Sequence, residues 1–560
     1  MTAQRVLFVF FTDPRRAFSS SVAALSAVVS AAGHEPEALE VFREYSIEDV
    51  AAHIDALNPD VLAMSCMTRD WPGAHALVDR LKTDTLVLVG GYHASLAPLE
   101  VAECEGVDAI CIGEGERPVT RLLDLLSRGE PLQTFEGLWV RSSNTGWEGD
   151  PPQADPEPDI AALPPWDYEV FGSVPDAIEA GINTFGPLID EYLPTRAGRG
   201  CPFTCAYCSA PRWGKLGRYS ESSRRNTRPV THLCAELASL RDRYQPEGFE
   251  FWDEHFPIDL KWLEEFAEVY PKMVGLPFKV EMHPNAATRP RLALLKKAGC
   301  SLFHCGIEAG DEAFRRGVLN RRTTDARLAA VFDDCRELDL ETSASLMTML
   351  PGETREQMKA TTDLLHRLKP GSFMWSNFHP LPGTVLGEAG VEHWPMPARA
   401  TFSDYDQVKT SMPPAVNAQE RAETFAELGA LQHQLVQIAA KRAGKEGGRP
   451  RARPIEVPVP MSPPSEALIR TLALPSPARP LAAAFDKGVL SVQVEHPAMG
   501  EKVIRFAPLE GHSHFVRARG FGLSYGGKEA PDTLLAMLRE LAERLGGTSL
   551  EALETAYRDA

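Results

Sequence analysis

Short apolar runs alternate with helical patterns over the first part of the chain, and this alternation limits the fold more than any other feature of the sequence. Runs such as RVLFVFF, DVLAMSC and TLVLVGG carry apolar residues at consecutive positions. Strands of that kind are buried on both faces, as in a parallel sheet covered by helices. Residues 1–135 are therefore predicted to form a doubly wound, flavodoxin-like α/β domain.

The same alternation returns over residues 191–390, after a segment at 136–190 that is rich in Pro, Asp and Gly and is predicted to be a linker. Six apolar runs recur there, and right-handed crossovers would arrange them as a partial (β/α)6 barrel. Beyond it we expect a helical extension at 391–445, a Pro- and Arg-rich linker at 446–480, and a small α+β domain at 481–560. This last domain is a candidate substrate-binding domain.

The net charge of the chain limits the kinds of molecule that it can bind. The 560 residues include 77 Asp and Glu against 58 Lys and Arg, for a net charge of −19. An acidic chain is a poor match for nucleic acid or an anionic membrane, because such partners require a basic face. The start, MTAQRVLFVFF, is typical of a buried strand rather than a signal peptide. We therefore expect a cytoplasmic protein that acts on a small-molecule or peptide substrate.

Three cysteines stand close together in the segment RGCPFTCAYCSAP. Cys201, Cys205 and Cys208 are separated by three and then two residues. Structural zinc sites use four protein ligands, usually in two separated pairs, and no second pair follows here. Three thiolates directly after a strand can instead hold three corners of an iron–sulfur cluster and leave the fourth iron open. The remaining cysteines are scattered through apolar segments, as expected of buried, reduced thiols.

The spacing CxxxCxxC, with Tyr207 before the last cysteine, resembles the signature of the radical S-adenosylmethionine (SAM) superfamily. The resemblance implies that the three cysteines bind a [4Fe-4S] cluster and that SAM binds its open iron. It makes Asp253 or Glu254, in FWDE, the candidate partner of the methionyl amine, although the superfamily usually has GGE there. Glu308, in GIEAGDE, is the candidate partner of the ribose.

The first domain resembles the N-terminal cobalamin domain of one radical SAM subfamily, on the motifs SCMT, GGYHAS and GEGE after its third, fourth and fifth strands. The resemblance covers about residues 1–390 and implies that cobalamin, as methylcobalamin, binds at the carboxyl ends of those strands. Each motif taken alone also fits a tight turn. The residues expected to bind the cofactors here are Ser65, Thr68, Arg69, Trp71, Gly90, Gly91, His93, Gly113, Glu114, Gly115 and Glu116.

Whether the protein supplies a lower ligand to cobalt depends on the first loop. FTDPRRAFSSS contains no histidine, whereas a DxHxxG loop would supply one to cobalt. Cobalamin is therefore expected to bind without a protein imidazole. Arg69 or Trp71 would lie under the corrin, and a weak axial field would ease methyl transfer from cobalt.

The family resemblance implies a methyltransferase that moves a methyl group from SAM through methylcobalamin to a carbon or phosphorus centre of a natural-product substrate. In the usual scheme a second SAM is cleaved with an electron from a low-potential donor such as flavodoxin or ferredoxin. A radical cyclase or rearranging enzyme of the same architecture stays open as an alternative. So does a noncatalytic corrinoid or cluster sensor.

Glu281, in FKVEMHP, bears on the reaction route. The strand pattern directs Val280, Glu281 or Met282 into the barrel, where a carboxylate is costly to bury without a cation or donor. In the simpler interpretation Glu281 pairs with a nearby Lys or Arg, or contacts SAM. In the other it approaches the open iron, as in the tryptophan C2 methylases, which this chain resembles in having an Arg below the corrin. Methylation would then be polar, with Arg69 and Glu281 as catalytic residues.

Overall fold

The computed structural model describes residues 2–12, 18–42, 46–142, 146–155, 158–171, 192–216 and 226–388, and short stretches between 420 and 553. It divides into two compact units. One comprises residues 1–41 and 47–448, and the other residues 42–46 and 449–560. Each unit is described by itself below.

The first unit begins with an α/β domain whose strands pair in the order β2-β1-β3-β4-β5-β6-β7. The pairs β1–β3, β3–β4 and β4–β5 are parallel, and β5–β6 and β6–β7 are antiparallel. This order confirms the flavodoxin-like prediction. The strands are β1 (Arg5–Thr12), β2 (Glu35–Phe42), β3 (Val61–Ser65), β4 (Leu86–Gly90), β5 (Ala109–Cys111), β6 (Leu138–Ser142) and β7 (Gly146–Trp147).

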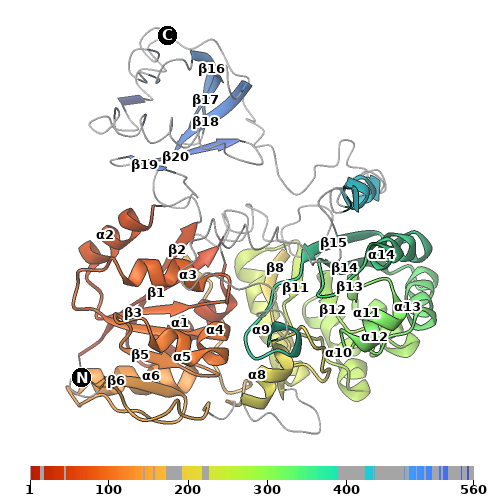
Figure 1. Ribbon diagram of the computed structural model, residues 1–560, viewed down its shortest axis with the longest axis horizontal. Helices are drawn as coiled ribbons and strands as arrows, with labels where there is room; N and C mark the ends of the chain where they lie inside the picture. Colours follow the sequence, from red (N-terminus) through yellow and green to blue (C-terminus); the bar gives the residue numbers. More distant parts are fainter. Residues whose placement is uncertain are drawn as a thin grey trace. The chain divides into compact units, whose positions relative to one another are not determined.

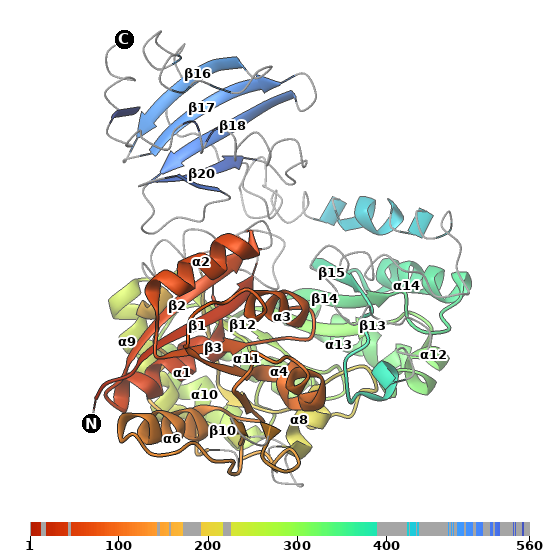
Figure 2. The same ribbon diagram turned by 60° about the vertical axis from the view of Figure 1, so that its left-hand side comes forward.

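Helices cover both faces of this sheet (Figures 1 and 2). Apolar side chains of the strands, such as Val6, Phe8 and Leu88, form one core with Val22 of α1 and Leu122 of α6. Consecutive apolar residues fill both faces, which is why the runs of the sequence predicted buried strands. The helices are α1 (Ser20–Ala31), α2 (Ile47–Leu57), α3 (Trp71–Val78), α4 (Gly91–Leu96), α5 (Pro98–Ala102) and α6 (Glu116–Ser127).

The sheet continues past residue 135, into the stretch predicted to be a linker. Strands β6 and β7 lie there, and the chain after them returns to the sheet. The Gly137 N–H donates to the Gln153 carbonyl at 2.8 Å, and Asp155 forms a parallel bridge with Gly113. The described residues up to 155 are therefore attached to the first domain.

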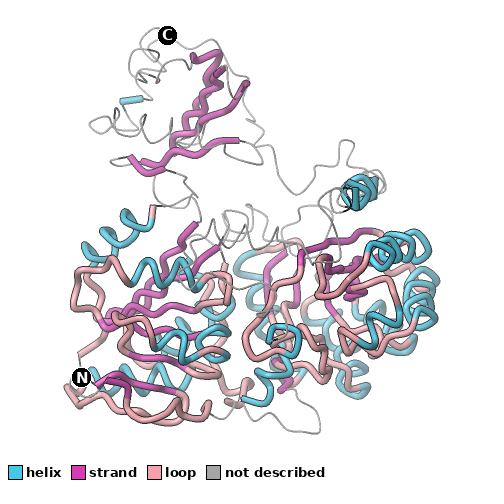
Figure 3. Tube along the Cα trace, in the orientation of Figure 1, coloured by secondary structure: helices cyan, strands magenta, loops and turns pink. Residues whose placement is uncertain are grey.

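The next domain is a curved parallel sheet in the order β15-β14-β13-β12-β11-β8, flanked by helices (Figure 3). All its adjacent pairs are parallel, which confirms the predicted partial (β/α)6 barrel. The sheet strands are β8 (Tyr192–Thr195), β11 (Gly248–Phe251), β12 (Phe278–Glu281), β13 (Cys300–Glu308), β14 (Glu341–Thr348) and β15 (Ser372–Asn377). A short antiparallel pair, β9 (Gly198–Arg199) and β10 (Asn226–Thr227), accompanies them.

The barrel helices pack an aromatic and aliphatic core against the outside of this sheet. Phe251, Phe266, Tyr270 and Phe278 meet edge-to-face or tilted, with ring centroids 4.8–6.2 Å apart. The helices are α8 (Ala210–Leu216), α9 (Val230–Tyr244), α10 (Leu260–Met273), α11 (Arg289–Ala298), α12 (Glu312–Gly317), α13 (Asp325–Glu337) and α14 (Arg355–Leu368).

The second unit contains an antiparallel sheet in the order β16-β17-β18-β20-β19. Its strands are β16 (Arg479–Asp486), β17 (Val489–His496), β18 (Gly500–Ala507), β19 (Val516–Ala518) and β20 (Phe521–Gly526). The helix expected after them, and most of the predicted segments at 391–445 and 446–480, lie outside the described residues. Within the described part of the chain, no helix has the length and apolar character needed to cross a membrane.

Candidate functional site

The carboxyl ends of the strands in both domains of the first unit line one cavity of about 390 Å³. The first domain contributes the ends of β3, β4 and β5, at the point where the strand order reverses between β1 and β3. Open α/β sheets bind ligands at such a switch point. The barrel contributes polar and aromatic residues from its first two strands and from α8, namely Arg196, Arg199, Trp213, Trp252 and Glu254.

Most of the residues predicted to bind cobalamin lie on the wall of this cavity. They are Ser65, Arg69, Gly90, Gly91, Gly113, Glu114, Gly115 and Glu116. The lining found among the described residues does not include Thr68, Trp71 or His93. Trp71 is buried in α3, where its ring stacks on those of His75 and His93 at 5.4 Å. Of the two residues expected under the corrin, the structure places Arg69, and not Trp71, at the cavity.

Two glycines shape this wall by allowing close approach of the backbone. Gly91 has φ +89°, and a Cβ atom there would lie 2.8 Å from the backbone nitrogen of Cys66. Gly113 has φ +85°, and a Cβ atom there would lie 2.7 Å from the Cβ of Ala154. Both positions require glycine, because an L side chain would be strained and would clash. The motifs GGYHAS and GEGE thus bring successive strand ends close together.

The two carboxylates of GEGE bind the barrel. Arg199 Nη1 donates to Glu114 Oε2 at 2.7 Å, and Arg199 Nη2 donates to Glu116 Oε1. Trp213 Nε1 also donates to Glu114, through Oε1 at 2.9 Å. All three charged groups are at least mostly buried. Glu114 and Glu116 therefore join the cobalamin-type domain to the segment that begins the cysteine loop.

Cys201, Cys205 and Cys208 lie in the loop between β9 and α8. The loop is held on the barrel by backbone hydrogen bonds from Ala206 N–H to the Leu319 carbonyl and from Leu386 N–H to the Ala206 carbonyl. Cys205 is buried, and the other two are partly exposed. Burial raises the pKa of the Cys208 thiol to about 12. A thiol of this kind ionises when a positive metal centre binds it.

The separation of the three sulfur atoms bears on what they can hold. Among the described residues, these cysteines do not form a set whose ligand atoms all lie within 4.8 Å of one another. A single tetrahedral zinc ion, with Zn–S bonds of about 2.3 Å, would bring sulfur atoms to about 3.8 Å. Three thiolates can also hold three corners of a cluster with several metal atoms.

Arg321 is a buried cation that contacts the cysteine loop, and no local motif in the sequence predicts it. Its Nη1 lies 3.0 Å from the Tyr207 hydroxyl and 3.5 Å from Cys205 Sγ. Its Nη2 donates to the Gly306 carbonyl at 2.7 Å, and Glu308 lies 3.8 Å away. One guanidinium group thus connects the loop, through Tyr207, to the end of β13.

The two acidic residues after β11 have different roles. Asp253 accepts hydrogen bonds from the backbone N–H groups of Ala197 at 2.9 Å and Gly198 at 2.8 Å, so both of its oxygens fix the turn between β8 and β9. Glu254 lines the cavity, and its Oε2 accepts from the Gly200 N–H at 3.1 Å. Of the two candidates for the methionyl amine, Glu254 is the one at the cavity.

Glu281 and Glu308 end the neighbouring strands β12 and β13, and the charge of Glu308 perturbs Glu281. Burial, followed by the charge of Glu308, raises the pKa of Glu281 to about 8, while Arg321 lowers it. Burial also raises the pKa of Glu308, and Arg321 and Tyr207 lower it. Arg321, which pairs with Glu308 at 3.8 Å, is the nearby cation that acts on Glu281, and the prediction that Glu281 pairs with a Lys or Arg or contacts SAM stays a prediction.

The sequence matches two family models. One is the B12 binding domain, over residues 16–123, and the other is the Radical SAM superfamily, over residues 195–365. An uncharacterized methyltransferase of Pyrococcus horikoshii is 24% identical over 358 residues, which cover 62% of this chain and 73% of the relative. An anaerobic magnesium-protoporphyrin IX monomethyl ester cyclase of Cereibacter sphaeroides is 28% identical over 364 residues, which cover 61% of this chain and 55% of the relative.

A solved structure has a similar fold. It is the radical SAM methyltransferase TsrM from Kitasatospora setae, with cobalamin and a [4Fe-4S] cluster bound, at a TM-score of 0.57 and 16% identity. The match covers 76% of this chain and 91% of TsrM. A second structure of TsrM contains its tryptophan substrate and a SAM analogue, aza-SAM.

Proposed function

This chain belongs to the cobalamin-dependent radical SAM methyltransferases, and on that premise we propose that it transfers a methyl group from SAM, by way of cobalamin, to a carbon or phosphorus centre of a small natural-product substrate. One observation carries the proposal. The cavity has the glycine-rich strand ends of the B12-type domain on one wall and Arg199 and Glu254, which flank or contact the cysteine loop, on the other.

The residues present fit both cofactors. The three thiols of Cys201, Cys205 and Cys208 form a ligand set for a [4Fe-4S] cluster that leaves one iron for SAM. The strand ends at Gly91 and Gly113 let the backbone line a flat, extended site for cobalamin. When bound, the cluster holds SAM and the corrin carries the methyl group, so the protein supplies binding, orientation and electrostatics.

Three side chains have proposed roles at the cofactors. Arg69, whose side chain is 45% exposed, lines the cavity and would disfavour a lower axial ligand to cobalt when cobalamin is bound. Glu254 accepts a hydrogen bond from the methionyl amine of SAM. Glu308, held near Arg321, accepts from the ribose hydroxyls.

Glu281 favours a second route, the polar methylation of tryptophan or a similar electron-rich heterocycle. Its carboxyl group has no ion-pair partner among the described residues, and it lies in the network of Glu308 and Arg321. With a cluster bound to the cysteine loop, Glu281 would be a candidate ligand for the open iron, and such binding would replace chelation by SAM. The likeness in fold to TsrM, of which one structure contains tryptophan substrate, supports tryptophan or a similar heterocycle as the acceptor. The radical route instead requires an electron from a low-potential donor such as flavodoxin or ferredoxin.

The first half-reaction can be tested without knowing the substrate. The reconstituted protein is incubated with cob(I)alamin and SAM that carries a deuterated methyl group. We expect the labelled methyl on cobalamin, together with S-adenosylhomocysteine. The variant Cys201→Ala/Cys205→Ala/Cys208→Ala should bind cobalamin and lose the label transfer, while Cys234→Ala, which removes a buried thiol of α9, should retain it. Absence of label from the corrin in the intact protein would favour a sensor.

The acceptor and the route are tested next. Tryptophan is supplied with SAM and methylcobalamin, with and without a low-potential reductant. Methylated tryptophan without 5′-deoxyadenosine supports the polar route, and 5′-deoxyadenosine in proportion to product supports the radical route. A product of unchanged carbon count from another acceptor would indicate a cyclase.

A further inference from the structure

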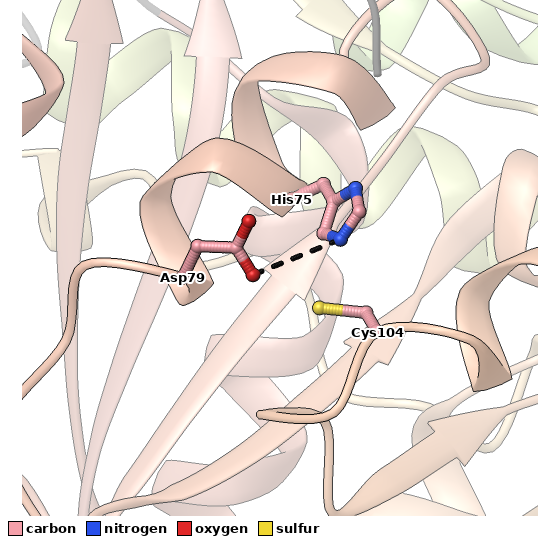
Figure 4. Close-up of side chains that lie close together, drawn as sticks. All are labelled: His75, Asp79 and Cys104. Atoms are coloured by element: carbon pink, nitrogen blue, oxygen red, sulfur yellow. Dashed lines mark ion pairs between the residues drawn. The ribbon is translucent and has the colours of Figure 1, made fainter. Parts of the chain in front are cut away.

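Away from the cavity lining, three metal-ligating side chains from two segments of the first domain lie together (Figure 4). His75 lies on α3, Asp79 follows the end of that helix, and Cys104 follows α5. Their ligand atoms, a ring nitrogen, a carboxylate oxygen and a sulfur, all lie within 4.8 Å of one another. Among the described residues, this is the one group of three or more that meets the criterion.

We propose that His75, Asp79 and Cys104 bind a zinc ion with a fourth position open to water. The donor set is one nitrogen, one oxygen and one sulfur atom, which suits zinc and does not suit the oxygen-preferring calcium and magnesium ions. Zinc bonds of about 2.0–2.3 Å place tetrahedral ligands about 3.3–3.8 Å apart. His75 Nε2 and Asp79 Oδ1 are already 3.8 Å apart, so small side-chain rotations close the site.

Contacts that do not involve the metal hold two of the ligands in place. The His75 ring stacks on Trp71 with centroids 5.4 Å apart and planes 3° apart, which fixes the imidazole plane. The backbone at Cys104 is fixed by Arg141, whose Nη2 donates to the Cys104 carbonyl at 2.9 Å and to the Ala102 carbonyl at 2.8 Å. Ligands held by second contacts lose little freedom when the metal binds.

The burial of the three residues gives the metal a path of entry. Cys104 is 1% exposed, whereas the side chains of His75 and Asp79 are 16% and 43% exposed. The simpler interpretation is a surface ion pair beside a buried thiol. A separation of 3.8 Å is too long for a hydrogen bond, and exposed pairs of this kind add at most about 1 kcal/mol. The buried thiol of Cys104 beside this pair completes a donor set of one nitrogen, one oxygen and one sulfur atom.

The proposed ion would join α3 to the segment between α5 and β5. Helix α3 begins directly after Arg69 and Asp70, which line the cavity, and Trp71 also stacks on His93 of α4. Zinc binding would therefore hold α3, which follows a cavity-lining loop, to the segment after α5. We assign the ion a structural role that is independent of the proposed methyl transfer.

The experiment uses the full chain with the substitutions Cys201→Ala, Cys205→Ala and Cys208→Ala, so that added metal cannot bind at the cysteine loop. Cobalamin binding by this variant serves as the control that the first domain is folded. Co²⁺ is titrated in first, and Zn²⁺ is then added as a competitor. We expect one Co²⁺ per chain, with a thiolate-to-cobalt charge-transfer band and the visible bands of a tetrahedral site, both abolished by Zn²⁺.

Ligand variants in the same background assign the bands. Cys104→Ser should remove the charge-transfer band, and Asp79→Asn, a change at an exposed side chain, should weaken Zn²⁺ binding about tenfold or more. Glu103→Gln and His232→Gln are matched controls that should bind as the parent does. A missing charge-transfer band at one equivalent of Co²⁺, a band that persists in Cys104→Ser, or unchanged Zn²⁺ affinity in Asp79→Asn would overturn the proposal. None of these results depends on methyl transfer.

Discussion

Replacing Glu281 with glutamine tests whether the carboxyl group of Glu281 is ionised in the folded protein, because glutamine keeps the shape of the side chain and cannot ionise. Burial and then Glu308 raise the pKa of Glu281 from 4.5 to about 8, and Arg321 lowers it. At pH 7 the carboxyl group of the folded, cluster-free protein is therefore mostly protonated. In the unfolded chain the same group is ionised above about pH 4.5.

The size and sign of the effect follow from proton linkage. The difference between 4.5 and about 8 corresponds to at most about 5 kcal/mol, at about 1.4 kcal/mol per pH unit. A raised carboxyl pKa means that the folded state binds more protons than the unfolded state. The contribution of Glu281 to the free energy of unfolding therefore falls as pH rises from about 4.5 to about 8, and it stays constant above that. Glu281→Gln has no such dependence.

The assay is urea denaturation of the cluster-free protein at pH 5 and pH 8, with the barrel transition followed by tryptophan fluorescence. We expect Glu281→Gln to unfold close to the parent at pH 5 and to be more stable than the parent, by up to about 5 kcal/mol, at pH 8. Glu264→Gln, at an exposed position on α10, is the control and should follow the parent at both pH values. An equal difference between Glu281→Gln and the parent at the two pH values would show that Arg321 keeps Glu281 ionised throughout.

Three further changes test the geometry around the cavity. Arg199→Ala leaves its two buried carboxylate partners without a cation and should lower the free energy of unfolding by about 3–5 kcal/mol in thermal or urea melts, with partial recovery in Arg199→Lys. Gly91→Ala should cost about 1–3 kcal/mol and weaken cobalamin binding, measured by equilibrium dialysis, because the new methyl group meets the Cys66 backbone at φ +89°. With Arg69 beneath the corrin, cob(II)alamin bound to the parent should show no nitrogen superhyperfine splitting in electron paramagnetic resonance; a splitting would contradict that placement.

The order of the strands could be predicted because each buried strand appears in the sequence as a local apolar run. Strands β6 and β7 were missed, since they are short edge strands in a segment whose Pro, Asp and Gly content is typical of loops. Strand β6 pairs with β5, about 30 residues away in the sequence, and β7 pairs with β6.

Site residues could be predicted where they lie close together in the sequence. They could not be predicted where their contacts are with residues far away in the sequence. The three cysteines lie within one loop, and their spacing alone marked them. Arg199 and Arg321 escaped attention because their partners are distant in sequence, such as Glu116 for Arg199 and Tyr207 for Arg321. Asp253 was found by position, but its hydrogen bonds to the β8–β9 turn required the folded backbone.

The return of the chain to the first sheet has a consequence for protein synthesis. Residues 137–155 cover the edge of β5 and bridge to Gly113, so the N-terminal domain cannot complete its sheet until that segment has left the ribosome. A fragment that stops at 135 would expose the unpaired edge of β5, a template for pairing with other chains and for aggregation. A fragment that extends past Asp155 would keep the edge covered. The cobalamin-type domain should therefore be expressed alone only with this returning segment included.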